Sequence, residues 1–381
     1  MTTAVPSEAL TFPALPAGLD TPRVVVDLAR VAANIERLQR EMDRRGIALR
    51  PHAKTHKSVA VARMQLAAGA RGITVGTLGE AEVFVGAGID DVFLAYPIWS
   101  DGPKADRLRA LHARAPRVRV GIDSIGGAER LAAAVAGTGA VVGAAARDPL
   151  VVLVEVDPGN HRTGLASPAE VVEVARAARA AGLVVAGVFS HGGHGYRVDG
   201  AASAGDDEAR TLGAAAAALR DAGFAIEVIS AGSTPTMLSA ATGAVNEMRA
   251  GTYVYGDRQQ WALGAIPAEG CAVAVAATVV SVHADRVVLD AGAKALTKDR
   301  ADWLAGFGAI VGYPDLVIER VNDYHGVVAT PPGADRPQLG QVVAIIPNHV
   351  CPVIDLVDTV VAVAADGTVE DWPVDARGRS G

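Results

Sequence analysis

A run of basic residues at positions 50–57, RPHAKTHK, follows a predicted strand and precedes a predicted helix. In a barrel of parallel strands, such a place is the catalytic mouth, because reactive groups gather at the C-terminal ends of the strands. A lysine such as Lys54, held among other cations and partly removed from water, has its ammonium form disfavoured. It can then act as a nucleophile toward an aldehyde. On spacing alone, a solvated basic turn explains the same residues better.

Two turns rich in small and hydroxyl residues follow later predicted strands. Gly232, Ser233 and Thr234 come just after one strand, and Gly251 and Thr252 follow the next. Uncovered backbone N–H groups and hydroxyls can bind an anion such as a phosphate. Ordinary glycine, serine and threonine turn chemistry explains both segments by itself, so they gain functional meaning only beside Lys54.

His349 and Cys351 are separated by one residue. If the chain is extended there, their side chains point to the same face and reach one cation. Cysteine is a soft ligand and histidine a borderline one, so zinc is the best-matched metal. Two ligands do not complete a tetrahedron, and the open positions would go to water and substrate, as in a catalytic site. Alone, the pair is better explained as a buried free cysteine beside a chance histidine.

His191, His194 and Tyr196 end another predicted strand. The spacing of the two histidines is compatible with a metal pair. Histidines at a glycine-rich strand end more often line a cofactor or form hydrogen bonds within the fold. We therefore assign these three residues to the wall of a pocket.

The composition excludes several classes of protein. The chain has 381 residues, a net charge of −7 and no dense basic run, which argues against a nucleic-acid partner. Half of the residues are hydrophobic, so disorder is excluded as the dominant state. No apolar stretch reaches the roughly 20 residues of a membrane helix. Two cysteines and an N-terminus without a secretory signal predict a cytoplasmic protein.

Short β-branched runs alternate with alanine-rich helical stretches, a pattern that predicts parallel strands joined by crossover helices. A capping box at Ser167 and Glu170, with Pro168 between them, marks one helix start, and Gly182 can end that helix. If the strand at 24–28 belongs elsewhere, eight strands remain, the number that closes a (β/α)8 TIM-like barrel. The predicted strands are 24–28, 48–52, 72–77, 92–96, 118–123, 151–157, 184–190, 227–231 and 247–251.

After residue 262 the sequence changes to valine-rich segments separated by Gly, Pro and Asp, which predicts an antiparallel β domain. We therefore expect an α/β fold with three parts: a flexible arm over 1–20, a barrel over 21–262 and a C-terminal β domain over 263–381. The first strand is free to join the β domain. An open doubly wound sheet is the alternative, but no GxGxxG turn follows an early strand.

Ten blocks, in this order, make the chain resemble the D-serine dehydratase and D-threonine aldolase family, pyridoxal-phosphate enzymes of the alanine-racemase-like fold (fold type III). The blocks are 50–57 (RPHAKTHK), 72–81 (GITVGTLGEA), 90–97 (DDVFLAYP), 154–164 (VEVDPGNHRTG), 191–196 (HGGHGY), 231–236 (AGSTPT), 249–253 (RAGTY), 290–296 (DAGAKAL), 325–326 (HG) and 347–352 (PNHVCP). Each is weak alone, but together they span nearly the whole chain.

The resemblance implies a role for each candidate. Lys54 would hold pyridoxal 5′-phosphate as a Schiff base, and Lys54, Arg162 and His191 would be the catalytic residues. His349 and Cys351 would bind Zn²⁺ or another divalent metal. The cofactor-binding set would be Lys54, Arg162, Tyr196, Gly232, Ser233, Thr234, Gly251 and Thr252. Proteins of this fold type usually form head-to-tail dimers, so we expect a homodimer.

The resemblance favours α,β-elimination of water from a D-amino acid with a β-hydroxyl group, followed by release of ammonia and a 2-oxo acid. The His-x-Cys pair is similar to that of the zinc-dependent D-serine dehydratase branch. The closest alternative is retro-aldol cleavage to glycine and an aldehyde, as in D-threonine aldolases. A racemase, a pyridoxal-phosphate carrier without turnover and a protein without cofactor are further alternatives.

Overall fold

The computed structural model describes residues 9–136 and 148–381. These residues form two compact units. The barrel unit comprises residues 39–54, 59–251 and 378–381, and the sheet unit comprises 9–38, 55–58 and 252–377. The predicted boundaries at 21–262 and 263–381 stay a prediction.

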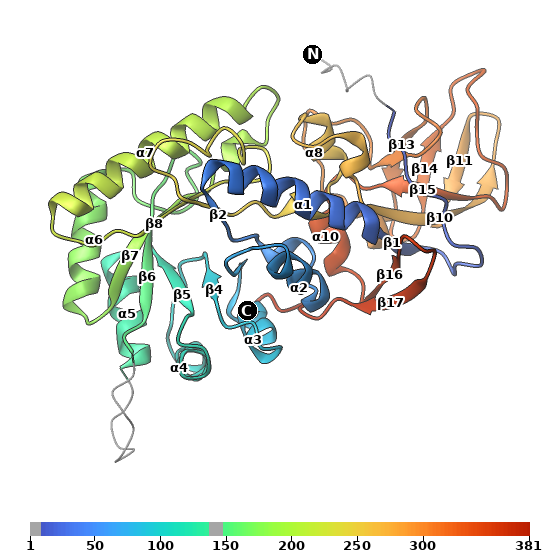
Figure 1. Ribbon diagram of the computed structural model, residues 1–381. Coiled ribbons are helices and arrows are strands. Elements are labelled where there is room, and N and C mark those ends of the chain that lie inside the picture. The colour runs from blue at the N-terminus through green and yellow to red at the C-terminus, as the bar shows by residue number, and fades with distance from the viewer. Residues whose placement is uncertain (1–8, 137–147) are drawn as a thin grey trace. The chain divides into compact units, whose positions relative to one another are not determined.

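The barrel unit contains a sheet of eight parallel strands, as the sequence predicts (Figure 1). The order is β2-β9-β8-β7-β6-β5-β4-β3. A parallel bridge between His52, just beyond β2, and Thr74 of β3 joins the two ends of this order. The strands are β2 (Ala48–Leu49), β3 (Ile73–Val75), β4 (Val92–Leu94), β5 (Arg119–Ile122), β6 (Val151–Glu155), β7 (Val184–Phe189), β8 (Val228–Ala231) and β9 (Glu247–Met248). Each is shorter than its predicted range.

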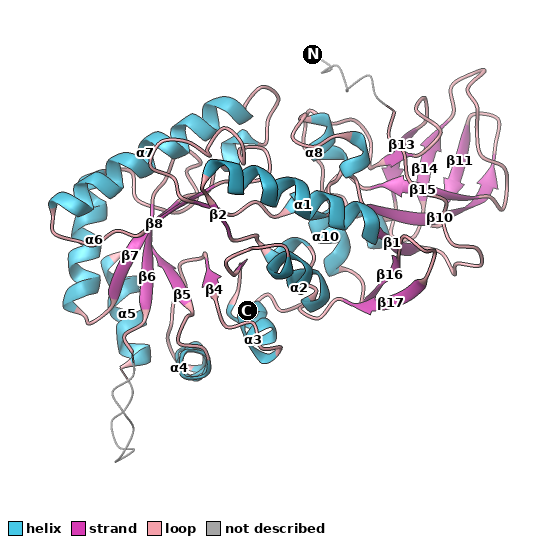
Figure 2. Ribbon diagram, viewed as in Figure 1, coloured by secondary structure: helices cyan, strands magenta, loops and turns pink. Residues whose placement is uncertain are grey.

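Helices separate consecutive strands of the barrel unit from β2 to β8, whereas turns without a helix join β8 to β9 (Figure 2). The predicted capping box is confirmed: Ser167 accepts from the Glu170 N–H, Pro168 is the first helical residue, and Gly182 follows the helix with φ +91°. These helices are α2 (Val59–Ala67), α3 (Leu78–Gly86), α4 (Pro103–Arg114), α5 (Ile125–Val135), α6 (Pro168–Ala180) and α7 (Ala201–Asp221).

The sheet unit is mainly antiparallel, as predicted, and it includes the first strand of the chain. β1 pairs antiparallel with β10 and parallel with β16. The first strand of the chain therefore lies in the same sheet as strands of the C-terminal part. The strands are β1 (Arg23–Asp27), β10 (Val273–Val282), β11 (Arg286–Leu289), β12 (Ala309–Ile310), β13 (Val317–Val321), β14 (Gly326–Ala329), β15 (Val342–Ile346), β16 (Thr359–Val363) and β17 (Val369–Pro373).

Besides short 3-10 turns, the described residues contain four further α-helices: α1 (Leu28–Arg45), α8 (Arg258–Ala262), α9 (Ala293–Leu296) and α10 (Val350–Asp355). The predicted flexible arm falls partly on residues 1–8, which lie outside the described residues. Of the remainder, Leu10 and Phe12 pack against the core cluster around Trp261. Within 9–136 and 148–381, no helix combines the length and the hydropathy needed to cross a membrane.

Candidate active site

Lys54 lies in a single 3-10 turn (Ala53–Thr55) directly after β2. Its side chain is exposed, and its backbone N–H donates to His52 Nδ1 at 3.3 Å. The parallel strands place this turn at their C-terminal ends, as the sequence predicts. The amine is therefore accessible within the barrel unit.

The sequence predicts that Lys54 is partly removed from water among the other cations of its basic run. This prediction is wrong, because Lys54 is exposed and two of those cations have carboxylate partners. Arg50 is buried and forms ion pairs with Asp91 at 2.6 Å and Glu247 at 2.8 Å. In the sheet unit, Lys57 forms an ion pair with Asp355 at 2.6 Å. The basic run is largely neutralised by carboxylates that are distant in sequence, and Lys54 itself is exposed.

Positive charge instead converges on His191, which follows β7. Burial and the nearby charges of Lys54, Arg162, Arg249 and His194 hold the pKa of His191 well below its ordinary value. The imidazole is therefore neutral near pH 7. An anion bound near these residues would offset their charge, so this side of the barrel unit suits a phosphate group.

Arg249 is a charged residue that the sequence reasoning did not single out. Its guanidinium lies 5.3 Å from the ring centre of Phe189, and its Nη1 donates to Ser230 Oγ at 2.7 Å. Burial lowers its pKa. An arginine inside a predicted barrel strand was the signal that could have revealed it.

Arg162 lies in the loop after β6, and about half of its side chain is exposed. Its Nη2 is 3.9 Å from Glu155 Oε1, and this carboxylate also accepts from Thr163 Oγ1 at 2.8 Å. Burial raises the pKa of Glu155. The Arg162 guanidinium thus has a carboxylate beside Nη2, and about half of its side chain stays accessible to a ligand.

His194 and Tyr196 lie beside His191, as predicted. The His191 and Tyr196 ring centres are 6.3 Å apart, and His194 Nε2 is 3.4 Å from Asp207 Oδ2. Among the residues that the structure describes, no three or more His, Cys, Asp or Glu side chains are grouped to hold a metal ion. The assignment of both histidines to a pocket wall therefore stays our interpretation.

The turn at 232–234 differs from its prediction in one respect. Gly232 has φ +98°, and a Cβ atom there would lie 1.9 Å from Met248 Sδ, so only glycine fits. Its N–H donates to a Glu208 oxygen at 2.9 Å, and the Ser233 N–H donates to Thr236 Oγ1 at 2.9 Å. Contrary to the prediction, these two N–H groups are already committed within the protein.

The sheet unit brings His349 and Cys351 together, although not in an extended chain. His349 is the residue before α10, and Cys351 is the second residue of that helix. The Cys351 sulfur is 3.2 Å from Thr55 Oγ1 and 3.8 Å from Thr252 Oγ1. The premise of an extended segment is wrong, because Cys351 is already part of the helix. The helix start nevertheless brings the His349 and Cys351 side chains within hydrogen-bond distance.

His349 has a carboxylate partner that the sequence reasoning missed. Its Nδ1 is 2.5 Å from Asp299 Oδ2. Burial alone would lower the pKa of His349, but the Cys351 charge and hydrogen bonds with Asp299 and Cys351 raise it to about 11. Asp299 lies 50 positions away in a segment with little regular pattern, so no local signal pointed to it.

Asp257 fixes the start of α10. Its side chain is fully buried and accepts the N–H groups of Gln260 at 2.8 Å and Val350 at 3.1 Å. Burial raises the pKa of Asp257 to about 6. Cys271, the second cysteine, is a core residue packed with Trp261, and burial raises the pKa of its thiol.

These residues fit the groups that the resemblance implies. The exposed amine of Lys54 suits the aldehyde of pyridoxal phosphate, and the cations near His191 suit an anionic ligand. His349 and Cys351 supply nitrogen and sulfur ligands, and Asp299 occupies the other imidazole nitrogen, as carboxylates do in many metal sites. A two-ligand site leaves positions open for water and substrate.

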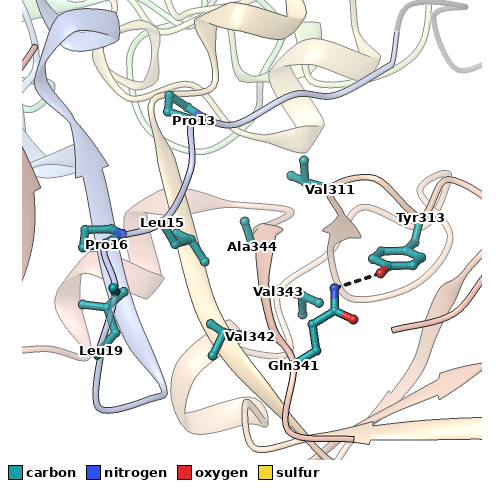
Figure 3. Close-up of a pocket in the computed structure, with 12 residues that line it drawn as sticks. Pro13, Leu15, Pro16, Leu19, Val311, Tyr313, Gln341, Val342, Val343 and Ala344 are labelled. Carbon is teal, nitrogen blue, oxygen red and sulfur yellow. Dashed lines mark hydrogen bonds between the residues drawn. The ribbon is translucent and has the colours of Figure 1, made fainter. Parts of the chain in front are cut away.

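A hollow of about 470 Å³ in the sheet unit lies apart from these candidate residues (Figure 3). The segment around Leu15 and strand β15 line it, and Gln341 Nε2 donates to Tyr313 Oη at 2.9 Å. None of the predicted site residues lines it. It therefore does not mark the reactive centre.

Two family models match the chain. The model of the alanine racemase N-terminal domain covers residues 26–259, and that of the serine dehydratase domain covers residues 272–363. Together with the eight-stranded parallel sheet and the C-terminal sheet, they define an enzyme of the alanine-racemase-like fold, a class that works with pyridoxal phosphate.

Full-length relatives narrow this class. The chain is 36% identical to D-threo-3-hydroxyaspartate dehydratase of Delftia sp. (strain HT23), covering 93% of this chain and 97% of the relative. It is 38% identical to D-threonine aldolase of Arthrobacter sp., covering 96% and 94%. It is 28% identical to D-serine dehydratase of Dictyostelium discoideum, covering 87% and 90%. The chain belongs to the D-serine dehydratase and D-threonine aldolase family and is a pyridoxal-phosphate-dependent lyase.

Solved structures agree with this assignment. That of D-threo-3-hydroxyaspartate dehydratase from Delftia sp. HT23 has a TM-score of 0.84 at 34% identity, covering 93% of this chain and 97% of that one. A histidine-to-alanine mutant and a cysteine-to-alanine mutant in the metal-free form are also known, and the two substituted positions are separated by one residue.

Proposed function

We propose that the chain is a pyridoxal-phosphate- and zinc-dependent lyase that removes water and ammonia from a β-hydroxy D-amino acid to give a 2-oxo acid. The observation that carries the proposal is the pairing of His349 and Cys351 at the start of α10. Hydroxide is a poor leaving group, and its departure benefits from a Lewis acid. A racemase or a cofactor carrier has no evident use for such a pair.

The substrate class is supported by what the relatives share. Their names specify 3-hydroxyaspartate, threonine and serine, all of which carry a hydroxyl group on the β-carbon, and each enzyme is named for the D form. The histidine and cysteine substituted in two solved structures of D-threo-3-hydroxyaspartate dehydratase have the same spacing as His349 and Cys351, and the cysteine mutant was solved in the metal-free form. We therefore assign metal binding to this pair.

Lys54 has two tasks in the proposal. Pyridoxal phosphate, when bound, withdraws electrons from the α-carbon of an amino acid. The Nζ of Lys54 holds the cofactor at rest and accepts the α-proton of the substrate. Its exposed position after β2 leaves the amine accessible for both.

Arg162 and His191 orient the reacting groups. The accessible part of the Arg162 guanidinium binds the ring oxygen of the cofactor or the substrate carboxylate. His191, neutral because of burial and neighbouring cations, acts through hydrogen bonds rather than as a charged group. Tyr196 stands beside it as a candidate for the ring nitrogen of the cofactor.

The two turns after β8 and β9 are assigned to the phosphate. Ser233 and Thr234 of the first turn contribute side-chain hydroxyls, and Gly232 keeps the turn open for close approach. Gly251 and Thr252 form the second turn. Two N–H groups of the first turn already have partners, so we place more weight on the hydroxyls than on the backbone.

The metal pair acts on the leaving group. His349 and Cys351 would hold the ion, which would supply a Lewis acid for negative charge on the β-oxygen. Asp299 holds Nδ1 of His349, so that Nε2 is left for the metal. Asp257 fixes the backbone between the two ligands through the Val350 N–H.

Retro-aldol cleavage to glycine and an aldehyde is the second candidate. It is favoured by the 38% identity to D-threonine aldolase. The same residues serve both reactions, since the metal either helps to expel the hydroxyl or lowers its pKa. The two reactions differ in their products.

A product assay decides between them. The holoenzyme is incubated with D-serine, D-threonine and D-threo-3-hydroxyaspartate, before and after chelation. The proposal predicts a 2-oxo acid and ammonia in equal amounts, with activity lost on chelation and restored by Zn²⁺. Glycine and an aldehyde as the only products would contradict dehydration and support the aldolase reaction. Racemisation that survives chelation would contradict both proposed reactions. Sedimentation of the same sample tests the expected homodimer.

A further inference from the structure

Glu208, in the first half of α7, is a buried carboxylate to which the proposed mechanism gives no task. Its side chain is fully buried. It accepts three hydrogen bonds: from Ser190 Oγ at 2.9 Å, from the Gly232 N–H at 2.9 Å and from Thr236 Oγ1 at 2.7 Å. All three partners donate, as an ionised carboxylate requires. Its buried charge is therefore compensated by hydrogen bonds.

These partners belong to two different strand ends. Ser190 follows β7, whereas Gly232 and Thr236 follow β8. The first of these loops also approaches the carboxylate closely, because a Cβ atom on Gly192 would lie 2.4 Å from Glu208 Oε2. One side chain from a helix thus ties together the segment before His191 and the turn proposed for the phosphate.

Thr236 connects Glu208 to Ser233 through hydrogen bonds of its hydroxyl group. Its hydroxyl proton is given to Glu208, so its oxygen is left to accept. It accepts the Ser233 N–H at 2.9 Å and lies 3.0 Å from Ser233 Oγ. Ser233 Oγ also lies 3.5 Å from the carbonyl oxygen of Gly192. Glu208 therefore fixes the directions of two hydrogen bonds at Thr236 Oγ1, the one donated to the carboxylate and the one accepted from the Ser233 N–H.

We propose that Glu208 is a positioning residue for the cofactor phosphate: it holds the 232–236 turn so that the hydroxyls of Ser233 and Thr234 meet the anion. This inference rests on the proposed function, in which that turn binds phosphate. Glu208 does not touch the anion. Its carboxylate stays on the protein side of the turn, where it accepts hydrogen bonds from the turn itself.

The test compares two ligands that differ only in the phosphate. Apo protein is titrated with pyridoxal 5′-phosphate and with pyridoxal, following absorbance, for the wild type, Glu208→Gln and Thr236→Val. Gln has one acceptor oxygen and one donor nitrogen, so it cannot accept hydrogen bonds at both positions of the carboxylate. Ser203→Ala is the matched control, because its hydroxyl on the same helix donates to Gly200 O, outside this network, at 3.2 Å.

We expect Glu208→Gln to weaken pyridoxal 5′-phosphate binding about tenfold, the effect of one lost charge-assisted hydrogen bond. Pyridoxal binding should change by less than about twofold, and Ser203→Ala should change neither affinity. Thr236→Val should match Glu208→Gln, and the double variant should be no weaker than either single variant, because the two groups act through one bond.

Equal weakening of both ligands would assign Glu208 a purely structural role and overturn the inference. Unchanged binding of pyridoxal 5′-phosphate would overturn it too. If Glu208→Gln does not fold, Thr236→Val decides by the same ratio of affinities. A wild-type protein that binds neither ligand would contradict the proposed function instead, so the two failures are distinguishable.

Discussion

Replacing Asp299 by asparagine tests how the metal ligand His349 is oriented. The change removes the carboxylate that lies 2.5 Å from His349 Nδ1 and keeps the size of the side chain. Losing such a partner of a metal-binding histidine typically costs 10–100-fold in metal affinity. About half of the Asp299 side chain is exposed, so water screens part of the interaction and the lower end applies. We expect Zn²⁺ to bind about tenfold more weakly, or about 1.4 kcal/mol.

The assay is a competition titration of metal-free protein against a chromophoric chelator. Asp302→Asn is the matched control, because it removes the same charge from an exposed position three residues further along. Asp302→Asn should bind Zn²⁺ like the wild type. Its comparison with Asp299→Asn separates the loss of a hydrogen bond from a general change in charge.

The reasoning would be refuted by two results. Unchanged Zn²⁺ affinity in Asp299→Asn would mean that the carboxylate does not orient the imidazole. Equal weakening in Asp299→Asn and Asp302→Asn would mean that only net charge matters. Either result would leave His349 as a candidate ligand without the partner proposed here.

Three further predictions concern single positions. Cys351→Ala should abolish measurable Zn²⁺ binding. Cys271→Ala, in the core, should keep Zn²⁺ binding and lower the free energy of unfolding by about 1 kcal/mol. Loss of Zn²⁺ binding in both variants would contradict the assignment of Cys351 as the ligand. Gly232→Ala should lower the free energy of unfolding by about 3 kcal/mol, because the added methyl meets Met248 Sδ and φ is positive. Gly243→Ala, whose added methyl meets open space, should lower it by about 1 kcal/mol. Thermal unfolding of both variants measures the difference. The pKa of Asp257 is raised from 3.8 to about 6. The folded state therefore favours the proton, and wild-type stability should fall by roughly 2 kcal/mol relative to Asp257→Asn as pH rises from about 4 to 6. The measurement is urea unfolding of both proteins at several pH values, and a stability difference that does not change with pH would contradict the prediction.

Features with local causes were predictable from the sequence. The capping box at Ser167 and Glu170 sets a helix start within four residues, and the structure has it at that place. The alternation of strands and helices gave the eight barrel strands, because each pattern is local. The predicted strands were too long, since the residues that follow the strands, such as Arg249, Ala250 and Gly251 after β9, lie outside the paired segments.

Features with distant causes were not predictable. Glu208 meets Gly232 and Thr236 across 24 and 28 positions, and Asp299 meets His349 across 50. No spacing rule links such residues before the fold is known. For the same reason, the charge around Lys54 was misjudged, because the acidic partners of its basic neighbours lie on other strands and helices.

The claim on which the function depends is that Lys54 carries the cofactor. Borohydride reduction of the holoenzyme, followed by peptide mapping, tests it directly. We predict one reduced pyridoxyl adduct on the peptide that contains Lys54, and none in Lys54→Ala. An adduct on another lysine, or no adduct in a protein that holds the cofactor, would contradict the account.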